Sequence, residues 1–219
     1  ENLIQMLMFW ELTSLSSFLL IGYWRQREDA RTGARMALAV TGAGGLALLG
    51  GILLLGRMTG SYDLSVVLAS GDLIRAHPLY VPTLLLILLG IFTKSAQFPF
   101  HFWLPHAMAA PTPVSSYLHS ATMVKAGVFL LARLFPALAG TWEWNHLVAG
   151  FGMLTLITGA VIALFQHDLK GLLAYSTISH LGLITVLFGI GTPLAAVAGI
   201  FHIINHATFK AGLFMAAGI

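Results

Sequence analysis

Long apolar runs separated by short polar stretches follow one another along the chain. Each run approaches the roughly 20 residues that an α-helix needs to cross the hydrocarbon core of a bilayer. We predict membrane spans at Leu3–Trp24, Met36–Gly56, Val81–Trp103, Pro113–Phe135, Leu147–Phe165, Leu172–Ile190 and Leu194–Gly218. The longest connection, Arg57–Tyr80, contains YDLSVVLASGDLIRAHP and predicts a short helix in the membrane interface. The pattern therefore predicts an all-α fold, a polytopic transmembrane helix bundle.

The composition agrees with a membrane location. Hydrophobic residues make up 58% of the chain and charged residues 9%, whereas about a quarter of a soluble domain is charged. The mean hydropathy is +0.86. The net charge of +3 comes from scattered cations, which gives no indication of nucleic-acid binding. The absence of cysteine excludes iron–sulfur clusters and thiolate metal sites, and we expect no cofactor and no bound metal.

The two ends of the sequence suggest a piece of a longer protein. The first residues, ENLIQMLMFW, lack an initial methionine and a signal-peptide pattern. The last residues, KAGLFMAAGI, stop within an apolar run. We therefore expect residues 1–219 to be a fragment of one membrane domain, without a soluble domain or a linker.

The distribution of positive charges predicts the orientation in the membrane. Cytoplasmic loops carry an excess of Lys and Arg. One side has five cations, Arg25, Arg27, Arg31, Arg35 and Lys170. The other side has three, Arg57, Arg75 and Arg133. The side with the arginine cluster is therefore expected to be cytoplasmic.

Four Glu or Lys residues lie well inside predicted spans: Glu11, Lys94, Lys125 and Lys210. A charge near the bilayer centre costs at least about 2.5–3.5 kcal/mol, so such residues usually mark an ion or proton path. A structural ion pair is the alternative for any one lysine. Lysine suits a proton relay because burial disfavours its charged form, while a nearby carboxylate favours it. A change in the distance between Glu11 and Lys94 can then load or release a proton.

Histidines accompany the lysines. In FHIINHATFKAG, His202, His206 and Lys210 are spaced at i, i+4 and i+8, which places them on one helix face. His119 lies one turn before Thr122 on the fourth predicted span. Histidine titrates near neutrality and can pass protons. Metal binding by His202 and His206 lacks a third ligand, and hydrogen bonding between packed helices is the other alternative.

A helix break is predicted beside the first lysine. Pro99 follows Lys94 by five residues and removes a backbone donor around Ala96–Gln97–Phe98. Freed backbone groups at membrane depth are tolerated only inside protein or beside a wet cavity, and ion transporters use broken helices in this way. A simple proline kink is the alternative. The sequence thus predicts a broken helix near Lys94–Pro99.

Four segments resemble a known family. They are FWELTSLSSFLLIGYW, FTKSAQFPFHFWLPHAMAAPTPVSSYLHSATMVKAG, HDLKGLLAYSTISHLGLI and HIINHATFKAGLF. They are similar to the antiporter-like proteins, which comprise proton-pumping membrane subunits of respiratory complex I and large subunits of Mrp-type antiporters. The resemblance implies an inverted-repeat fold, with family helices 5 to 11 present. Residues 1–140 then belong to the first repeat and residues 141–219 begin the second.

The resemblance also implies roles for individual residues. Glu11 matches the essential glutamate of the family, Lys94 the lysine on its broken helix, and His119 the histidine of the next helix. Lys210, with His202 and His206, matches the group that links two half-channels. Lys125 together with PTPVSSYLHSATM favours the A-type large subunit of Mrp antiporters over the complex I subunits.

The function implied by the resemblance is proton translocation in a multisubunit Na⁺/H⁺ antiporter of the bacterial cell membrane. Other small membrane subunits are the expected partners, and Na⁺ and H⁺ the transported ions. The alternative is a proton-pumping subunit of an NADH:quinone oxidoreductase. An inert scaffold is less consistent with four buried ionisable groups, and a membrane enzyme lacks a nucleophile–base pair, a metal motif or a nucleotide loop.

The positions of the three buried lysines predict a lateral relay. Each lysine is roughly mid-way along a separate span, so the lysines lie at similar depth. We expect a hydrated row in the membrane plane, with water joining groups that are too far apart for direct hydrogen bonds. Its members are Glu11, Lys94, His119, Lys125, His202, His206 and Lys210. The helix break and the polar residues His167, Asp168 and Lys170 are the candidates for proton intake from the inner face.

Overall fold

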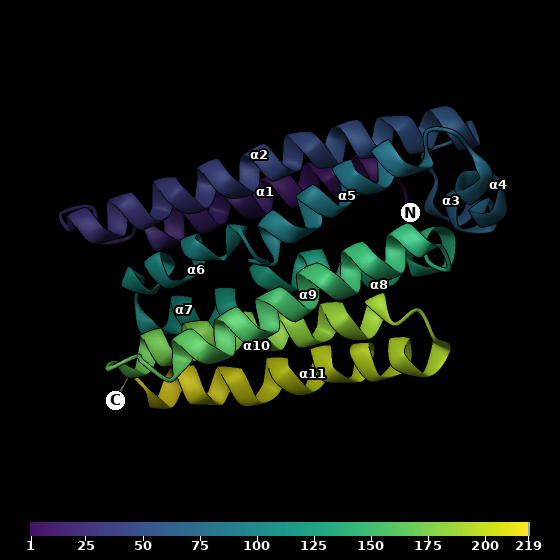
Figure 1. Cartoon of the computed structure of the whole chain (residues 1–219). Helices are drawn as coiled ribbons and strands as arrows, with labels where there is room; N and C mark the ends of the chain where they lie inside the picture. Colours follow the sequence, from purple (N-terminus) through teal and green to yellow (C-terminus); the bar gives the residue numbers. More distant parts are fainter. Residues whose placement is uncertain (219) are drawn as a thin grey trace.

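Helices α1 to α11 and two short 3-10 helices make up residues 1–218, which the computed structural model describes (Figure 1). The first five helices are α1 (Leu3–Ile21), α2 (Glu28–Thr59), α3 (Leu64–Ala69), α4 (Gly71–Ala76) and α5 (Tyr80–Lys94). The middle elements are η1 (Phe100–Phe102), α6 (Trp103–His106), η2 (Ala107–Ala109), α7 (Thr112–Ser120) and α8 (Met123–Leu138). The last three are α9 (Trp142–Ala163), α10 (Leu169–Gly189) and α11 (Pro193–Ala216).

Five segments of the described chain are long and apolar enough to cross a membrane. They are α1, α2, the pair α7 and α8 taken together as Thr112–Leu138, α9 and α10. The predicted spans Val81–Trp103 and Leu194–Gly218 are not among these five, and each has a physical reason. Helix α5 has only 15 residues because it stops at Lys94, and the 24 residues of α11 include two histidines, an asparagine and a lysine. The predicted all-α bundle is confirmed.

Helix α2 is longer than the predicted span Met36–Gly56. It begins at Glu28 and has 32 residues, so the arginine-rich stretch up to Arg35 is mostly helical. The hydropathy pattern marks only the part of a helix that contacts lipid, while backbone hydrogen bonding continues through polar residues. Glu28 and Asp29 in the first turn are also favourable beside the positive end of the helix dipole.

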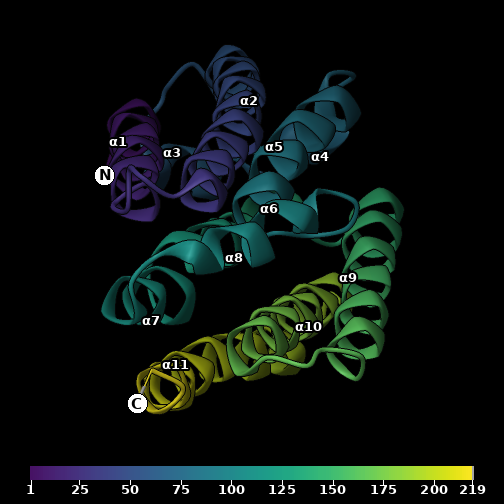
Figure 2. The same cartoon turned by 90° about the vertical axis from the view of Figure 1, so that its left-hand side faces the viewer.

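Two groups of helices pack on either side of a central pair. Figure 2 shows α1, α2 and α5 on one side, α9, α10 and α11 on the other, and α7 and α8 between them. Helix α8 contacts both α5 and α10, and α7 packs against α11. Because α7 and α8 touch both groups, side chains from either group can meet along this central pair.

The turns of the chain alternate between two ends of the bundle. The α1–α2 and α9–α10 turns lie at the same end, together with α6 (Figure 1). The α3–α4 segment lies at the opposite end, near the N-terminus. The residues His167–Lys170 therefore share an end with the arginine-rich start of α2, as the predicted topology requires.

Candidate functional site

The helix break predicted beside Lys94 is present. Helix α5 ends at Lys94, and η1 begins only at Phe100. Ala96 has a φ of 48°, in the left-handed region that non-glycine residues rarely adopt. The backbone groups freed by the break are bonded within the protein: Trp103 Nε1 donates to the Thr93 carbonyl at 2.9 Å, and the Phe98 amide donates to Thr155 Oγ1 of α9 at 2.9 Å. This satisfies the requirement for non-helical backbone at membrane depth.

Lys94 is fully buried and its ammonium group reaches α1. Nζ donates to the Trp10 carbonyl at 2.9 Å and to Ser14 Oγ at 2.7 Å. It also lies 5.2 Å from the centroid of the Trp10 ring, within range of a cation–π contact. Uncharged groups of one helix therefore hold the end of the lysine.

Glu11 lies next to Trp10 on α1 and is half-buried. The three ion pairs of the described residues do not include it. The charges of Glu11 and Lys94 interact through space, but the two side chains do not form a direct salt bridge. Glu11 Oε1 is buried without a hydrogen-bond partner among the described residues. The distance between acid and base is thus not fixed by a mutual bond.

A second break divides the predicted span Pro113–Phe135. Helix α7 ends at Ser120 and α8 begins at Met123, so the predicted span is present as Thr112–Leu138 but is interrupted, which was not predicted. Thr122 has φ −111° and ψ −89°, and its Oγ1 donates to the Tyr117 carbonyl at 2.8 Å. His119 and Lys125 lie on the two sides of this break. Each of the two breaks therefore has a buried lysine next to it.

The two breaks are joined by one serine. Ser95 Oγ donates to the Val124 carbonyl at 2.7 Å and accepts from the Val128 amide at 3.0 Å. Gly127 allows this approach, because a Cβ at that position would lie 2.2 Å from Ser95 Oγ. Ser95 directly follows Lys94, and Val124 directly precedes Lys125. The side chain that follows one lysine is thus bonded to the backbone on either side of the other lysine.

Lys125 belongs to a cluster of buried basic groups. Its Nζ is 2.8 Å from Nδ1 of His206 on α11. The ring of His180 on α10 has its centroid 5.0 Å from that of His206, and its Nδ1 is 3.0 Å from His202 Nε2. We call Lys125, His206, His180 and His202 the histidine cluster. It brings together three of the predicted relay residues from two helices.

His180 was missed by the sequence analysis. It lies in the stretch AYSTISH, whose polar residues look like an ordinary hydrophilic helix opening. A usable signal was present, because Ser176 and His180 are four residues apart and share a helix face. Both face α11: His180 contacts His202, and Ser176 Oγ accepts from Lys210 Nζ at 2.9 Å.

Lys210 and His119 are buried without joining the cluster through direct hydrogen bonds. Lys210 Nζ donates to Ser176 and to the Leu173 carbonyl at 3.2 Å, both on α10. Both ring nitrogens of His119 lack partners among the described residues, and the ring packs near Phe214 at a centroid distance of 6.4 Å. The groups of the predicted row thus form separate hydrogen-bonded sets, and no direct hydrogen bond joins one set to the next.

The predicted intake residues lie at the N-terminal end of α10. His167 and Asp168 are exposed. Asp168 Oδ2 accepts from the Gly171 amide at 2.6 Å, so it caps the N-terminus of α10. Lys170 Nζ donates to the Ala110 carbonyl at 3.4 Å. These contacts are structural, and none of them reaches the buried lysines.

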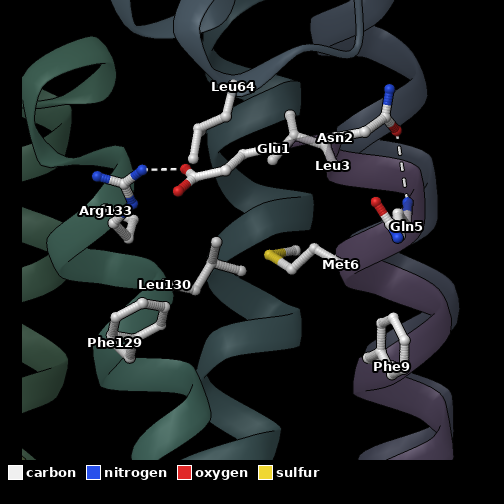
Figure 3. A pocket seen from close by; sticks show the side chains of 10 residues that line it. All are labelled: Glu1, Asn2, Leu3, Gln5, Met6, Phe9, Leu64, Phe129, Leu130 and Arg133. Carbon is white, nitrogen blue, oxygen red and sulfur yellow. Dashed lines mark hydrogen bonds and ion pairs between the residues drawn. The ribbon is translucent and has the colours of Figure 1, made fainter.

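A cavity of about 300 Å³ lies at the other end of the bundle, between α1 and α8. Figure 3 shows Glu1 and Arg133 forming an ion pair at its wall, above Met6, Phe129 and Leu130. It contains none of the predicted relay residues. Within residues 1–218, no group of three or more His, Cys, Asp or Glu side chains could hold a metal ion.

Comparisons with known proteins show what this chain is similar to. Residues 1–219 match the family described as "NADH:quinone oxidoreductase/Mrp antiporter, TM". The chain is 69% identical over 218 residues to the probable A/B subunit of a K⁺/H⁺ antiporter from Rhizobium meliloti, covering all of this chain and 22% of that protein. It is 53% identical over 233 residues to the A-type Na⁺/H⁺ antiporter subunit of Alkalihalophilus pseudofirmus, covering all of this chain and 29% of that protein.

Two solved structures are also similar. The Mrp complex from Dietzia sp. has a TM-score of 0.94 and 46% identity, over all of this chain and 24% of that chain. The membrane-bound sulfane sulfur reductase, an archaeal respiratory membrane complex, has a TM-score of 0.89 and 29% identity, over 99% of this chain and 45% of that chain. The chain spans about a quarter of the length of the curated relatives that it matches.

Proposed function

This chain belongs to the NADH:quinone oxidoreductase/Mrp antiporter membrane family, and from that premise we propose that it forms part of the proton-translocating subunit of a cation/proton antiporter in the bacterial cell membrane. The family resemblance predicted from the sequence is confirmed. The two named relatives above are antiporter subunits, which supports a transporter rather than an enzyme. The observation that carries the proposal is the histidine cluster, in which a buried lysine is bonded to an imidazole 2.8 Å away.

The chemistry of the cluster suits proton transfer. Lys125 in its charged form has a proton on Nζ, and neutral His206 can accept it on Nδ1. The proton moves along the existing hydrogen bond, leaving a neutral lysine and an imidazolium. His180 and His202 are bonded to each other in the same way, nitrogen to nitrogen at 3.0 Å. Rotation of the neighbouring rings then passes the proton along α10 and α11.

Glu11 controls the proton on Lys94 in this scheme. The carboxylate stabilises the charged lysine most strongly when the two are close, because charges interact strongly in a low-dielectric interior. Movement at the α5 break increases the separation, and Lys94 then releases its proton toward Lys125. Water bridges the remaining gaps between Lys94, Lys125 and Lys210. His119 lies beside the second break and completes the row.

The route to the inner face is part of the same proposal. We place it at the arginine-rich end of the bundle, where His167, Asp168 and Lys170 surround the start of α10 and the α5 break opens toward α6. The acidic and basic groups there can deliver protons from water. The route to the outer face is not assigned to residues of this chain.

Other membrane subunits are the proposed partners. Asn205 is exposed on α11, between the exposed apolar residues Phe201 and Ile204 on one side and Thr208 on the other. An amide facing hydrocarbon without a partner is unfavourable, which supports coverage of this face by further protein. We also propose that residues 1–140 belong to one repeat of the fold and residues 141–219 to the start of the second, with residue 219 outside the described part.

Everted vesicles from cells lacking their own antiporters test the function. The complete complex is expressed, respiration acidifies the vesicle lumen, and the loss of the pH difference is measured after addition of NaCl or KCl. We expect a cation-dependent loss, and the sequence favours Na⁺. A response to K⁺ alone would identify K⁺ as the transported cation, which is the cation in the name of one relative. No response to either cation, with proton movement driven by electron transfer instead, supports the complex I alternative.

A further inference from the structure

The carboxylate of Glu11 occupies space that exists only because residue 45 is glycine. A Cβ built on Gly45 of α2 would lie 1.6 Å from Glu11 Oε1 and 2.6 Å from Glu11 Cδ. These separations are far below any van der Waals contact. Glu11 thus reaches across from α1 and rests against the bare backbone of α2 at Gly45.

The neighbouring Gly44 is close to α5, the helix that carries Lys94. A Cβ on Gly44 would lie 1.7 Å from Thr93 Oγ1 and 2.7 Å from Thr93 Cβ, and Thr93 directly precedes Lys94. Gly45 of α2 therefore contacts Glu11 on α1, and the preceding Gly44 contacts Thr93, the residue before Lys94 on α5. Helix α2 packs against both α1 and α5.

We propose that Gly45 is a positioning residue for Glu11, setting where the carboxylate lies and hence its distance from Lys94. The inference rests on the proposed antiport function. Glu11 Oε1 is buried and makes no hydrogen bond among the described residues, so no bonded partner fixes that oxygen. Steric contact with α2 therefore constrains the position of Oε1.

A methyl group at position 45 displaces the carboxylate rather than the helix. The atoms it meets are the far end of a flexible side chain, with three rotatable bonds, whereas a methyl group at position 44 also meets Thr93 Cβ close to the backbone. The Lys94 bonds to Trp10 and Ser14 hold α1 against α5 and do not involve the Glu11 carboxylate. Gly45→Ala thus moves one charge while the backbone stays in place.

Few other ionisable groups complicate the outcome. Helix α1 carries Glu11 as its only titratable residue, and α2 has none between Arg35 and Arg57. Helix α5 contributes Lys94 and the terminal Tyr80, and α8 contributes Lys125 and Arg133. Helix α7, which also packs against α1, contributes Tyr117 and His119. A shifted pH profile in Gly45→Ala therefore reports mainly on the Glu11–Lys94 separation.

Gly42→Ala is the matched control. It makes the same substitution one turn earlier in α2, and a Cβ there meets nothing within 4 Å. Both changes raise helix propensity equally, by about 1 kcal/mol. Any difference between the two variants therefore comes from the space beside the residue.

The test uses the full-length subunit in its assembled complex, reconstituted in proteoliposomes. Cation-dependent proton flux is measured from about pH 6 to pH 9, around the range where histidine and shifted lysine titrate. We expect Gly42→Ala to match the wild type. Gly45→Ala should lower the flux about tenfold and shift the pH of half-maximal flux, within the coupling found between contacting residues.

Glu11→Asp supplies the second measurement. The shorter side chain withdraws the carboxylate from the position that a Cβ on residue 45 needs. In the Glu11→Asp background, Gly45→Ala should therefore change the flux less than about twofold, a non-additivity that marks direct contact. If Gly45→Ala hinders assembly, Glu11→Asp should restore it for the same reason.

Two results overturn the inference. One is equal flux and an equal pH profile in Gly45→Ala and Gly42→Ala. The other is a loss in Gly45→Ala, of flux or of assembly, that is just as large in the Glu11→Asp background. A wild-type complex without cation-dependent flux instead contradicts the proposed function, and the assembly measurements then still test the contact between residues 11 and 45.

Discussion

The two lysines beside the helix breaks have opposite surroundings. Lys94 is bonded to a carbonyl and a hydroxyl and lies near the carboxylate of Glu11. Lys125 is bonded to an imidazole, and the sequences of α8, α10 and α11 contain no Asp or Glu. The first site can hold a charge and its counter-charge together. The second has only basic groups, so several protons there repel one another.

This difference assigns different tasks to similar residues. In the proposed relay, the distance between Lys94 and Glu11 determines whether Lys94 holds its proton. In the histidine cluster, the same proposal has no acid to retain a proton, so a second proton would repel the first. The N-terminal half of the chain is therefore suited to gating protons and the C-terminal half to conducting them. The predictions below test that division.

The largest effect on transport is expected from substitutions of Lys94. Lys94→Ala should reduce antiport to background while the complex still assembles, because the variant removes the proton carrier at the break. Lys94→Arg should also fail, since the guanidinium remains charged and cannot release a proton. Flux in proteoliposomes is the measurement. Cation-dependent flux near the wild-type level in Lys94→Ala contradicts the assignment.

The acid should be nearly as sensitive. Glu11→Gln removes the counter-charge and should impair transport severely, whereas Glu11→Asp keeps the charge and should retain part of the activity. The measurement is flux across about pH 6–9. If the flux of Glu11→Gln equals that of the wild type at every pH, no charge is needed at this position. The proposed difference between Lys94 and the histidine cluster is then contradicted.

His180→Phe tests conduction in the second region. The ring keeps its approximate shape but loses the nitrogen that bonds His202. We expect flux to fall about a hundredfold, the low end of the effect of a positioned proton-transfer group. His146→Phe on α9 is the control, because His146 is exposed. Equal flux in both variants removes His180 from the path.

The link between the regions should have a smaller effect. Ser95→Ala deletes the hydroxyl that bonds Val124 and Val128. The loss of a buried hydrogen-bonding group costs about 1–3 kcal/mol, so the thermal unfolding temperature of the complex should fall and flux should decrease moderately. Val128→Ala keeps both bonds and serves as a comparison for packing. An unchanged melting temperature contradicts the role of Ser95 as a link.

The smallest effect is expected at the intake. Asp168→Ala removes the cap of α10 and should cost about 1 kcal/mol of stability, whereas Asp168→Asn keeps a capping side chain. The two variants separate structure from chemistry. If the charge helps to deliver protons, flux in Asp168→Asn should fall about twofold, within what a single exposed charge can contribute. Full flux in Asp168→Asn limits this residue to its cap.

The sequence predicted the features that depend on local composition. Apolar length gave the spans, Pro99 gave the first break, and the unusual burial of Lys94, Lys125 and Lys210 marked the site. The second break could not be predicted, because residues 120–122 contain neither proline nor glycine. It depends on tertiary contacts, including the bond from Thr122 to Tyr117.

The pairing of side chains was also beyond the sequence. Spacing places His202, His206 and Lys210 on one face, but it does not say which helix that face meets. His206 meets Lys125 of α8, and Lys210 meets Ser176 of α10. His180 shares a helix face with Ser176, but it becomes part of the site only because α10 packs against α11. The relay itself remains a prediction.

The bond from Ser95 to α8 restricts how the sequence can vary in length. One residue inserted between Val124 and Gly127 rotates the rest of α8 by about 100° around its axis, and one inserted between Lys94 and Ser95 displaces the serine from the end of α5. Such a change points a lysine away from its partners and also breaks the serine contact. The segment that connects η2 to α7, around Ala110 and Pro111, does not take part in the serine contact. Among relatives that retain both lysines, alignment gaps should therefore fall between the two breaks and not beside either one.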